Sequence, residues 1–252
     1  MQDTYIGDEG KGFPLVLLHG FLGSSKIWKP QIDFFKDHFR VITPDLPGFG
    51  KSNKAKLHKN IKSMSNLILE CLKEKKINKF HLLGHSMGGM IVQEMAKKEG
   101  DKISKLICYS TGPRGEMPGR FETIDQSREN LKKKGLESTT RSIAKTWFTL
   151  GDKAKHFELC IQSGKETSIE AADNCLAVFK SWNGVDNLKH IKNETLIIWG
   201  DKDKSYNLTQ AKTLEKNISN SSLVIFEGCA HNVHLEKIEE FNRTVFNFIN
   251  SN

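Results

Sequence analysis

Short apolar runs alternate with longer amphipathic stretches along the chain. Six runs are rich in Val, Ile and Leu and are closed by Gly, Pro or Asp: FPLVLLHG, FRVITPDLPG, KFHLLGHS, KLICYST, ETLIIWG and SSLVIFEG. Such runs are typical of strands buried on both faces of a sheet. The amphipathic stretches predict helices near 25–38, 60–76, 87–99, 205–218 and 235–249. Together they predict an α/β fold with a mostly parallel, doubly wound sheet.

One region breaks this alternation. From about 112 to 190 there is no strand candidate, only polar helical stretches and the segment TGPRGEMPGRFET. We interpret 112–190 as a helical cap, or lid, over the carboxyl ends of the strands, where parallel sheets bind ligands. Residues 1–111 and 191–252 then form the core. An ordinary run of surface helices is the alternative, which the length of the region disfavours.

The whole-chain composition limits the function classes. A chain of 252 residues suits one large domain. No apolar run approaches the roughly 18 residues of a membrane helix, and the polar N-terminus shows no signal peptide. The cysteines are odd in number, scattered and never in a C-x-x-C pair, which favours reduced thiols in a cytoplasmic protein. They are Cys71, Cys108, Cys160, Cys175 and Cys229.

The net charge of +8 raises the question of a nucleic-acid partner. The 38 basic residues include only six arginines, which leaves 32 lysines spread along the chain. Nucleic-acid readers concentrate arginine and aromatic residues on one face. We therefore expect a solvated surface and no nucleic-acid or membrane partner. The expected partner is a small-molecule substrate, with a mild preference for anions left open, and the expected state is a monomer or homodimer.

The segment GHSMG, between a predicted strand and a predicted helix, has the pattern G-x-S-x-G. In this context the pattern predicts a nucleophile elbow, a sharp turn that raises the Ser86 oxygen above the sheet edge. Small residues at Gly84 and Gly88 let the strand and helix approach closely. The backbone N–H of Met87 at the helix start can then face a developing oxyanion.

A serine nucleophile needs a base, and the base needs an orienting carboxylate. TLIIWGDKDKS supplies Asp201 and Asp203 after one predicted strand, and FEGCAHNVHLE supplies His231 and His234 after the next. These residue types and their order, Ser then Asp then His, are those of a Ser-His-Asp triad. The spacing alone does not decide between Asp201 and Asp203 as the acid, or between His231 and His234 as the base.

The segments HGFLGSSKIW, PDLPGFGKS, GHSMGGMIV, TLIIWGDKD and GCAHNVHLE resemble the serine-nucleophile branch of the α/β-hydrolase superfamily. The chain is similar to 3-oxoadipate enol-lactonases, C–C hydrolases and haloperoxidase-like esterases. This resemblance implies the α/β-hydrolase fold, with the cap inserted after the sixth strand of its usual numbering. It selects Asp203 and His231 for the triad, adds the Phe21 N–H to the oxyanion hole beside Met87, and implies no metal or organic cofactor.

The chain also departs from the family pattern. The N-terminal hairpin is shortened to about one strand at TYIG, and no proline follows the acid. The remaining candidates have structural interpretations: Asp201 as a turn residue, and His234 with Glu236 as a capping or packing pair. His85 packs beneath the turn, and His19 bonds backbone beside the oxyanion loop. GFGKS lacks the spacing of a phosphate-binding loop.

Serine favours attack at a carbonyl, whereas related epoxide hydrolases and dehalogenases carry an aspartate at this position. We therefore expect a carboxylesterase or lactonase that works through an acyl-enzyme. A C–C hydrolase or cofactor-free lyase with the same triad is the alternative, and a non-catalytic receptor is a further one. Candidate substrate-binding residues in the cap are Arg114, Arg120, Trp147 and Trp182. An arginine there either holds a substrate carboxylate or pins the lid.

Overall fold

The computed structural model describes residues 4–116 and 118–251, and within them the chain forms one seven-stranded sheet. The strand order is β1-β3-β2-β4-β5-β6-β7, and every neighbouring pair is parallel except β1 with β3. The strands are β1 Ile6–Glu9, β2 Pro14–Leu18, β3 Arg40–Pro44, β4 Phe80–His85, β5 Ile103–Tyr109, β6 Thr195–Gly200 and β7 Ser221–Phe226.

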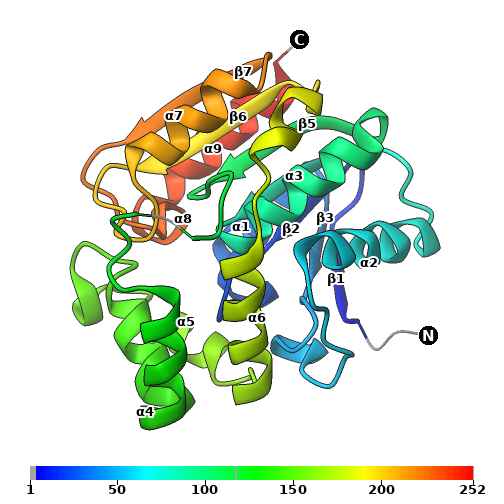
Figure 1. Ribbon diagram of the computed structural model, residues 1–252. Helices are drawn as coiled ribbons and strands as arrows, with labels where there is room; N and C mark the ends of the chain where they lie inside the picture. Colours follow the sequence, from blue (N-terminus) through cyan, green and yellow to red (C-terminus); the bar gives the residue numbers. More distant parts are fainter. Residues whose placement is uncertain (1–3, 117, 252) are drawn as a thin grey trace.

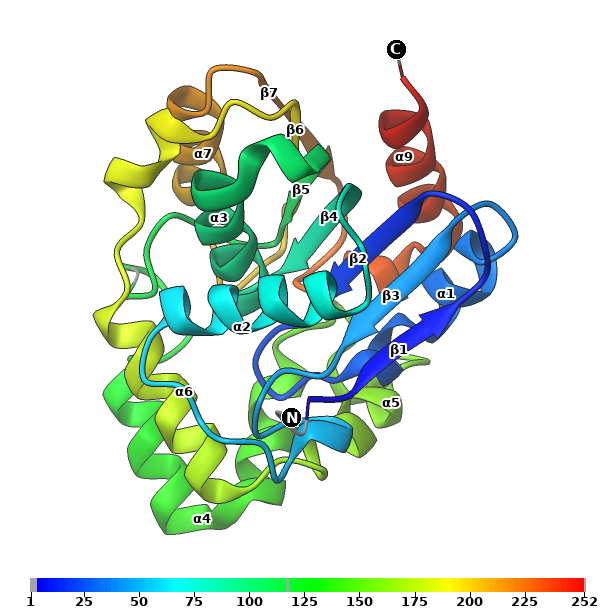
Figure 2. The ribbon, with the colours of Figure 1, turned by 90° about the vertical axis from the view of Figure 1, so that its right-hand side faces the viewer.

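Helices cover both faces of this sheet. In Figure 2, α2 and α3 lie on one side of the strands and α1 and α9 on the other. The α-helices are α1 Lys29–Phe35, α2 Ile61–Glu74, α3 Met87–Glu99, α4 Ile124–Lys145, α5 Phe157–Gly164, α6 Ile169–Ser181, α7 Leu208–Asn217, α8 Val233–Glu236 and α9 Ile238–Asn250. The 3-10 helices are Ser25–Trp28, Gly50–Ser52, Gly100–Lys102, Gly151–Lys153 and Val185–His190.

The alternation of side chains along each strand divides the core into two clusters. Val16 and Leu18 of β2 pack into the cluster under α2, α3 and α7, while Leu15 and Leu17 pack into the cluster under α1 and α9. This is the period of two that a strand imposes, with both of its faces buried. It explains why the strand runs are apolar throughout rather than alternating with polar residues.

The prediction of a doubly wound, mostly parallel sheet is confirmed, and each of the six apolar runs contains a strand. The expected single strand near TYIG is β1, which begins at Ile6 and pairs antiparallel with β3. Within the described residues one strand, β1, precedes β2, and the long helical segment follows β5. That position corresponds to the sixth strand in the usual numbering of the fold.

The segment between β5 and β6 contains α4, α5 and α6, which lie together at one end of the sheet in Figure 1. Gly135 interrupts α4 with a φ of 76°, so this helix is kinked. Leu131, Phe157 and Leu176 of these helices belong to the same apolar cluster as Val16 and Leu18 of the sheet. The three helices therefore share their packing with the sheet and have no separate core of their own.

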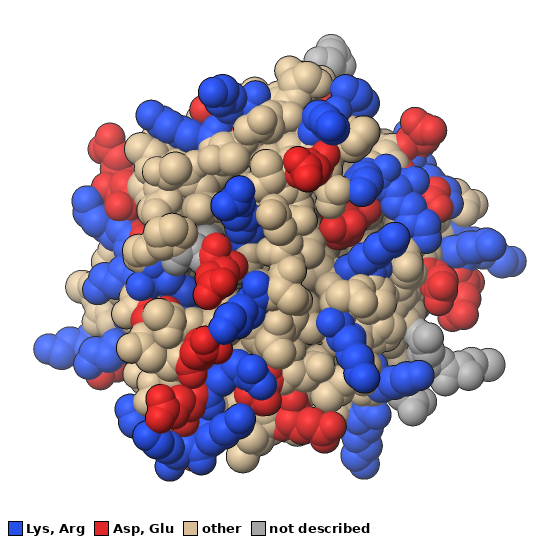
Figure 3. Space-filling model, in the orientation of Figure 1, with Lys and Arg blue, Asp and Glu red and all other residues tan. Residues whose placement is uncertain are grey.

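Basic and acidic side chains are intermixed on the surface. Figure 3 shows Lys and Arg over much of one face with Asp and Glu between them. Several lysines pair with an acid one helical turn away, such as Lys29 with Asp33 and Lys133 with Glu129. Among the described residues, no helix has both the length and the apolar character that crossing a membrane requires.

Candidate active site

The Ser86 turn has the strained geometry of a nucleophile elbow. Ser86 joins β4 to α3 with a φ of 55°, in the left-handed region that non-glycine residues rarely adopt. A Cβ on Gly84 would lie 2.3 Å from the Gly88 carbonyl oxygen, and one on Gly88 would lie 2.4 Å from the Leu18 carbonyl oxygen. Glycine is therefore required at both places for β4, α3 and β2 to approach so closely.

Hydrogen bonds from β5 hold this turn in place. The Ser86 N–H donates to the Tyr109 carbonyl at 2.9 Å. The Thr111 hydroxyl donates to the Ser86 carbonyl at 2.8 Å. No sequence motif marked Thr111, because its partner, Ser86, lies 25 residues earlier in the chain, in the turn after β4.

Asp203 lies in the loop after β6 and makes the contact expected of an orienting acid. Its Oδ2 accepts a hydrogen bond from His231 Nδ1 at 2.8 Å. Its Oδ1 accepts bonds from the backbone N–H groups of Ser205 at 2.7 Å and Tyr206 at 3.2 Å. The carboxylate is fully buried, so these three donors replace the water that it loses.

Asp201, the other candidate acid, points elsewhere. It accepts a hydrogen bond from the Gly228 N–H at 2.6 Å and forms an ion pair with Lys202. Its side chain keeps 25% of its surface exposed, while that of Asp203 keeps none. The geometry therefore agrees with a turn role for Asp201.

The two candidate histidines also occupy different places. His231 is buried beside the cavity described below, whereas His234 packs against Trp28 with ring centroids 4.7 Å apart. The Tyr109 hydroxyl donates to the His231 carbonyl at 3.0 Å and accepts from the His234 N–H at 3.1 Å. Burial, with His231 nearby, lowers the pKa of His234, so its imidazole stays neutral.

Ser86 and His231 line one narrow cavity, which also takes residues from the helical segment between β5 and β6. The centre of a water molecule can occupy a volume of about 30 Å³ in this cavity. Holding one water requires roughly 10–15 Å³ of that kind of volume. Among the described residues, the Ser86 hydroxyl and the His231 side chain are not hydrogen-bonded to each other. The lining residues are Gly20, Phe21, Gly23, Ile27, His85, Ser86, Gly115, Arg120, Phe121, Ile143, Trp147, Phe179, Ser205, Tyr206, His231 and Asn232.

The loop after β2 lies directly against Ser86. A Cβ on Gly20 would lie 2.8 Å from Ser86 Cβ. His19 anchors the loop, because its Nε2 accepts from the Leu46 N–H at 2.9 Å and its Nδ1 donates to the Gly20 carbonyl at 2.8 Å. Burial lowers the pKa of His19, which agrees with this neutral tautomer. The expected backbone role of His19 is thus observed, and Phe21, the residue after Gly20, lines the cavity.

His85 lies beneath the turn, as expected. Its ring stacks on Tyr109 with centroids 4.6 Å apart and approaches His231 at 4.6 Å. Its burial, with His231 and His234 nearby, holds its pKa well below the ordinary value. Glu236 does not pair with His234 in the way the sequence suggested: its carboxylate accepts from Ala230 N and from Thr149. It therefore ties the His231 loop to the helical segment between β5 and β6.

The four cap candidates divide into two pairs. Arg120 and Trp147 line the cavity, whereas Arg114 and Trp182 do not. Arg114 is exposed and forms an isolated β-bridge with Asn183, so it lies on the outer surface of the segment between β5 and β6. The Trp182 indole N–H donates to Glu94 at 3.0 Å and so ties the end of α6 to α3.

The GFGKS segment closes around a carboxylate of the protein itself. Asp45 accepts hydrogen bonds from the backbone N–H groups of Ser25 and Lys51. A Cβ on Gly50 would lie 2.4 Å from Asp45 Oδ2. These N–H groups, which a phosphate-binding loop would offer to a phosphate, already donate to Asp45. The glycines of this segment are therefore explained by packing around Asp45, without a bound nucleotide.

Comparison with known proteins places the chain in a family. The family model described as the alpha/beta hydrolase fold matches residues 14–238. A pimeloyl-[acyl-carrier protein] methyl ester esterase of Legionella pneumophila (strain Corby) is 30% identical over 255 residues, covering 98% of this chain and 100% of that protein.

Solved structures agree with this match. The bromoperoxidase from Bacillus anthracis is 25% identical with a TM-score of 0.91, covering 98% of this chain and 95% of that one. The enol-lactonase from Burkholderia xenovorans LB400 is 20% identical with a TM-score of 0.88, covering 98% of this chain and 96% of that one. The predicted resemblance is confirmed, and the chain belongs to the α/β-hydrolase family.

Proposed function

We propose that the protein is a serine hydrolase that cleaves a small carboxylic ester or lactone through an acyl-enzyme. Ser86 Oγ attacks the carbonyl carbon while His231 Nε2 takes the serine proton. The tetrahedral intermediate collapses as His231 returns that proton to the leaving oxygen, which leaves the acyl group on Ser86. Water, deprotonated by His231, then releases the acid and restores the serine.

The hydrogen bond between His231 Nδ1 and Asp203 Oδ2, at 2.8 Å, is the observation that carries this proposal. A carboxylate can only accept, so Nδ1 holds the proton and Nε2 keeps its lone pair. Ser86 and His231 line the same cavity, so the hydroxyl and the imidazole share the space in which a substrate carbonyl would sit. Hydrogen bonds of catalytic groups are often long without substrate and shorten when it binds.

Two backbone N–H groups complete the proposed site. Phe21 lies at the cavity wall and Met87 begins α3, directly after the nucleophile. Both belong to segments held against Ser86, the first by the close approach of Gly20 and the second by the elbow itself. Donors so placed stabilise the oxyanion, and losing one typically costs roughly 3–4 kcal/mol of transition-state stabilisation.

The division into a core of 1–111 and 191–252 and a cap of 112–190 is part of the proposal. The cap supplies Ile143, Trp147 and Phe179 to the cavity wall. Phe179 of α6 contacts Phe21 edge-on with ring centroids 5.6 Å apart, so the cap touches the oxyanion loop. An apolar, narrow cavity suits a small acyl group, and a larger substrate enters only if the cap shifts.

An activity-based label tests the proposal. The wild-type protein should react with a fluorophosphonate and hydrolyse a short activated ester, and Ser86→Ala should abolish both. The matched pair His231→Ala and His234→Ala separates the two histidines, because only His231 contacts Asp203. We expect the first to lose activity by several orders of magnitude and the second to keep a folded, labelled enzyme.

Other outcomes of this experiment point to other functions. Labelling of a residue other than Ser86, or equal damage from both histidine variants, contradicts the proposal. Turnover of a substrate without an acyl-enzyme in mass spectra points instead to a C–C hydrolase or lyase that uses the same side chains as acid and base. Neither labelling nor turnover over an ester panel of increasing chain length points to a ligand receptor on this fold.

A further inference from the structure

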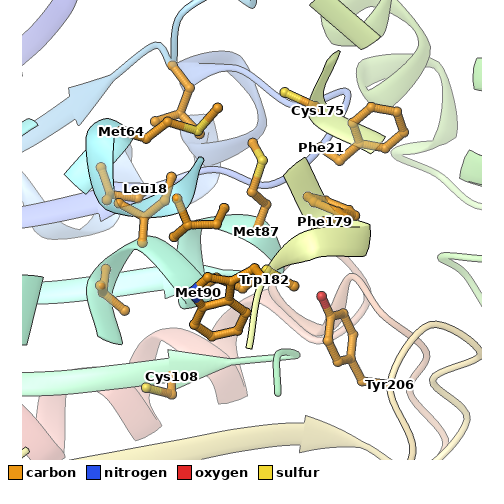
Figure 4. Packing of buried hydrophobic residues seen from close by; sticks show 14 of the residues in the cluster. Leu18, Phe21, Met64, Met87, Met90, Cys108, Cys175, Phe179, Trp182 and Tyr206 are labelled. Atoms are coloured by element: carbon orange, nitrogen blue, oxygen red, sulfur yellow. The ribbon is translucent and has the colours of Figure 1, made fainter. Parts of the chain in front are cut away.

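Tyr109 is the last residue of β5, and the sequence motifs did not single it out. Figure 4 shows Cys108, the residue before it, among packed side chains that include Met90. Because side chains alternate along a strand, Tyr109 points to the opposite face of the sheet, into the cluster that includes Phe241. Its ring is fully buried there and stacks on His85 with ring centroids 4.6 Å apart. The side chain therefore lies behind the cavity rather than in its wall.

The main chain of Tyr109 holds the turn of the proposed nucleophile. The Ser86 N–H donates to the Tyr109 carbonyl at 2.9 Å. His85, the residue before Ser86, is the register partner of Tyr109 where β4 pairs with β5. The position of the Ser86 main chain is therefore set by the end of β5 at Tyr109.

The Tyr109 hydroxyl has three polar neighbours. Its oxygen lies 3.0 Å from the His231 carbonyl oxygen, 3.0 Å from His234 Nδ1 and 3.1 Å from the His234 backbone nitrogen. A hydroxyl has one hydrogen and two lone pairs, and a carbonyl oxygen only accepts. The hydrogen must therefore lie toward His231, because otherwise two acceptor oxygens would face each other. The backbone N–H and the Nδ1–H of His234 then donate to the hydroxyl oxygen.

This arrangement assigns each hydrogen of the group to one acceptor. Burial raises the pKa of Tyr109 well above its ordinary value, so the hydroxyl keeps its hydrogen. The imidazole of His234 is neutral, and its single ring proton lies on Nδ1. His234 thus orients the Tyr109 hydroxyl, and the hydroxyl in turn donates to the His231 carbonyl.

The main chain around His231 is held at three successive residues. The Ala230 N–H donates to the Glu236 carboxylate at 2.6 Å, and the Asn232 N–H donates at 3.0 Å to a backbone carbonyl in the segment between β5 and β6. Between them, the His231 carbonyl accepts from the Tyr109 hydroxyl at 3.0 Å. The bond from Nδ1 to the proposed acid fixes the far end of the imidazole. Tyr109 therefore helps to fix the near end, where the side chain leaves the main chain.

We propose that Tyr109 is a positioning residue that sets the place of the base relative to the nucleophile, because its carbonyl holds the Ser86 main chain and its hydroxyl holds the His231 main chain. This inference rests on the proposed function and adds a residue to it. His231 takes the proton of Ser86 Oγ during acylation and that of water during deacylation. Removing the Tyr109 hydroxyl should therefore slow both steps. Since Tyr109 does not line the cavity, substrate binding should not change.

The expected size of the effect follows from the contacts that remain. Misplacing a catalytic group by about 1 Å can cost about a hundredfold in rate. Without the Tyr109 hydroxyl, the His231 carbonyl keeps its longer contact with His85 Nε2 at 3.3 Å. The bond from His231 Nδ1 to Asp203 also remains. We therefore expect a smaller fall in kcat, of about tenfold.

Tyr109→Phe is the direct test, since it removes the hydroxyl and keeps the ring against His85. Active-site titration with a fluorophosphonate counts the functional sites, and hydrolysis of a short activated ester then gives kcat per site. We expect kcat per site and the rate of fluorophosphonate labelling to fall together by about tenfold, with an unchanged KM. A residue that only stabilised the fold would change the number of functional sites and not the rate at each site.

Thr195→Val is the matched control. The Thr195 hydroxyl is buried and donates to the Asn193 carbonyl at 2.8 Å, at the end of β6 away from Asp203. The control therefore loses a similar buried hydrogen bond at the opposite edge of the sheet. Its kcat per site should equal that of the wild type.

Nitrogen NMR of the wild-type protein tests the same arrangement without any substitution, so it does not depend on the folding of a variant. We expect a neutral His234 that carries its proton on Nδ1. A proton on Nε2 would turn the Tyr109 hydrogen toward Nδ1 and away from the His231 carbonyl. That result would overturn the inference.

The outcomes separate this inference from the proposed function on which it rests. Neither labelling nor turnover in the wild type would contradict the serine mechanism itself. A labelled wild type, with unchanged kcat per site in Tyr109→Phe, would overturn only the role of Tyr109. The same fall in Thr195→Val would assign the loss to reduced stability and overturn that role as well.

Discussion

Adding one methyl group at Gly20 is the most specific perturbation of the proposed oxyanion hole. Gly20 has no positive φ, so alanine fits its backbone conformation. The new Cβ would nevertheless lie 2.8 Å from Ser86 Cβ and 3.1 Å from the His85 carbonyl oxygen. Carbon atoms in contact prefer about 3.5–4.0 Å, so the loop and the elbow must separate by at least roughly 0.7 Å.

That displacement matters more for catalysis than for folding. A donor stabilises an oxyanion only when it lies about 2.7–3.1 Å from the charged oxygen, and a shift of this size moves the Phe21 N–H outside the range. Losing one donor lowers kcat by about 10²–10³-fold, or roughly 3–4 kcal/mol. Overpacking by one methyl group typically costs about 1–3 kcal/mol of unfolding free energy, which leaves a folded protein.

Steady-state kinetics with a short activated ester measure this effect, and thermal unfolding shows that the variant is folded. Gly100→Ala is the matched control, because its new Cβ would meet only the Asn193 side chain, at 3.2 Å, far from Ser86. We expect kcat to fall in Gly20→Ala and to stay within twofold of wild type in the control. A Gly20→Ala enzyme with wild-type kcat would refute the argument that this loop presents a donor to the reacting carbonyl.

Two further predictions concern stability and substrate preference. Burial lowers the pKa of His81 from 6.5 to about 4, so the unfolded chain takes up a proton in this window that the folded chain does not. The free energy of unfolding should therefore fall as the pH drops from 6.5 to 4, by about 3 kcal/mol from this residue. In denaturant titrations at several pH values, His81→Phe should make the unfolding free energy less dependent on pH. An unchanged pH dependence in this variant would contradict the prediction. The substrate preference is tested at Arg120, which lines the cavity while Arg114 does not. If Arg120 holds an anionic group of the substrate, Arg120→Ala should raise the KM of carboxylated esters about tenfold more than the KM of neutral esters. Arg114→Ala should raise neither KM. Equal effects of Arg120→Ala on both ester types would exclude that role.

The sequence predicted the parts of the molecule that depend on local rules. Strands buried on both faces need continuous apolar runs, so the positions of these runs along the chain were enough to locate the strands of the sheet. The elbow at Ser86 needs glycine at fixed spacings, which is why five residues predict a strained turn that the structure contains. The choice of Asp203 over Asp201 required the family resemblance, because both lie in the same loop and only their tertiary contacts differ.

The residues that the sequence missed share one property: their partners are distant in the chain. Thr111 donates to the Ser86 carbonyl from the loop after β5, and Tyr206 stacks on His231 from the loop after β6. Neither position needs a particular backbone conformation, so no local pattern marks it. The motifs therefore encode the turn at Ser86, while the side chains that surround it arrive through the sheet order, which brings the carboxyl ends of β4, β5 and β6 together.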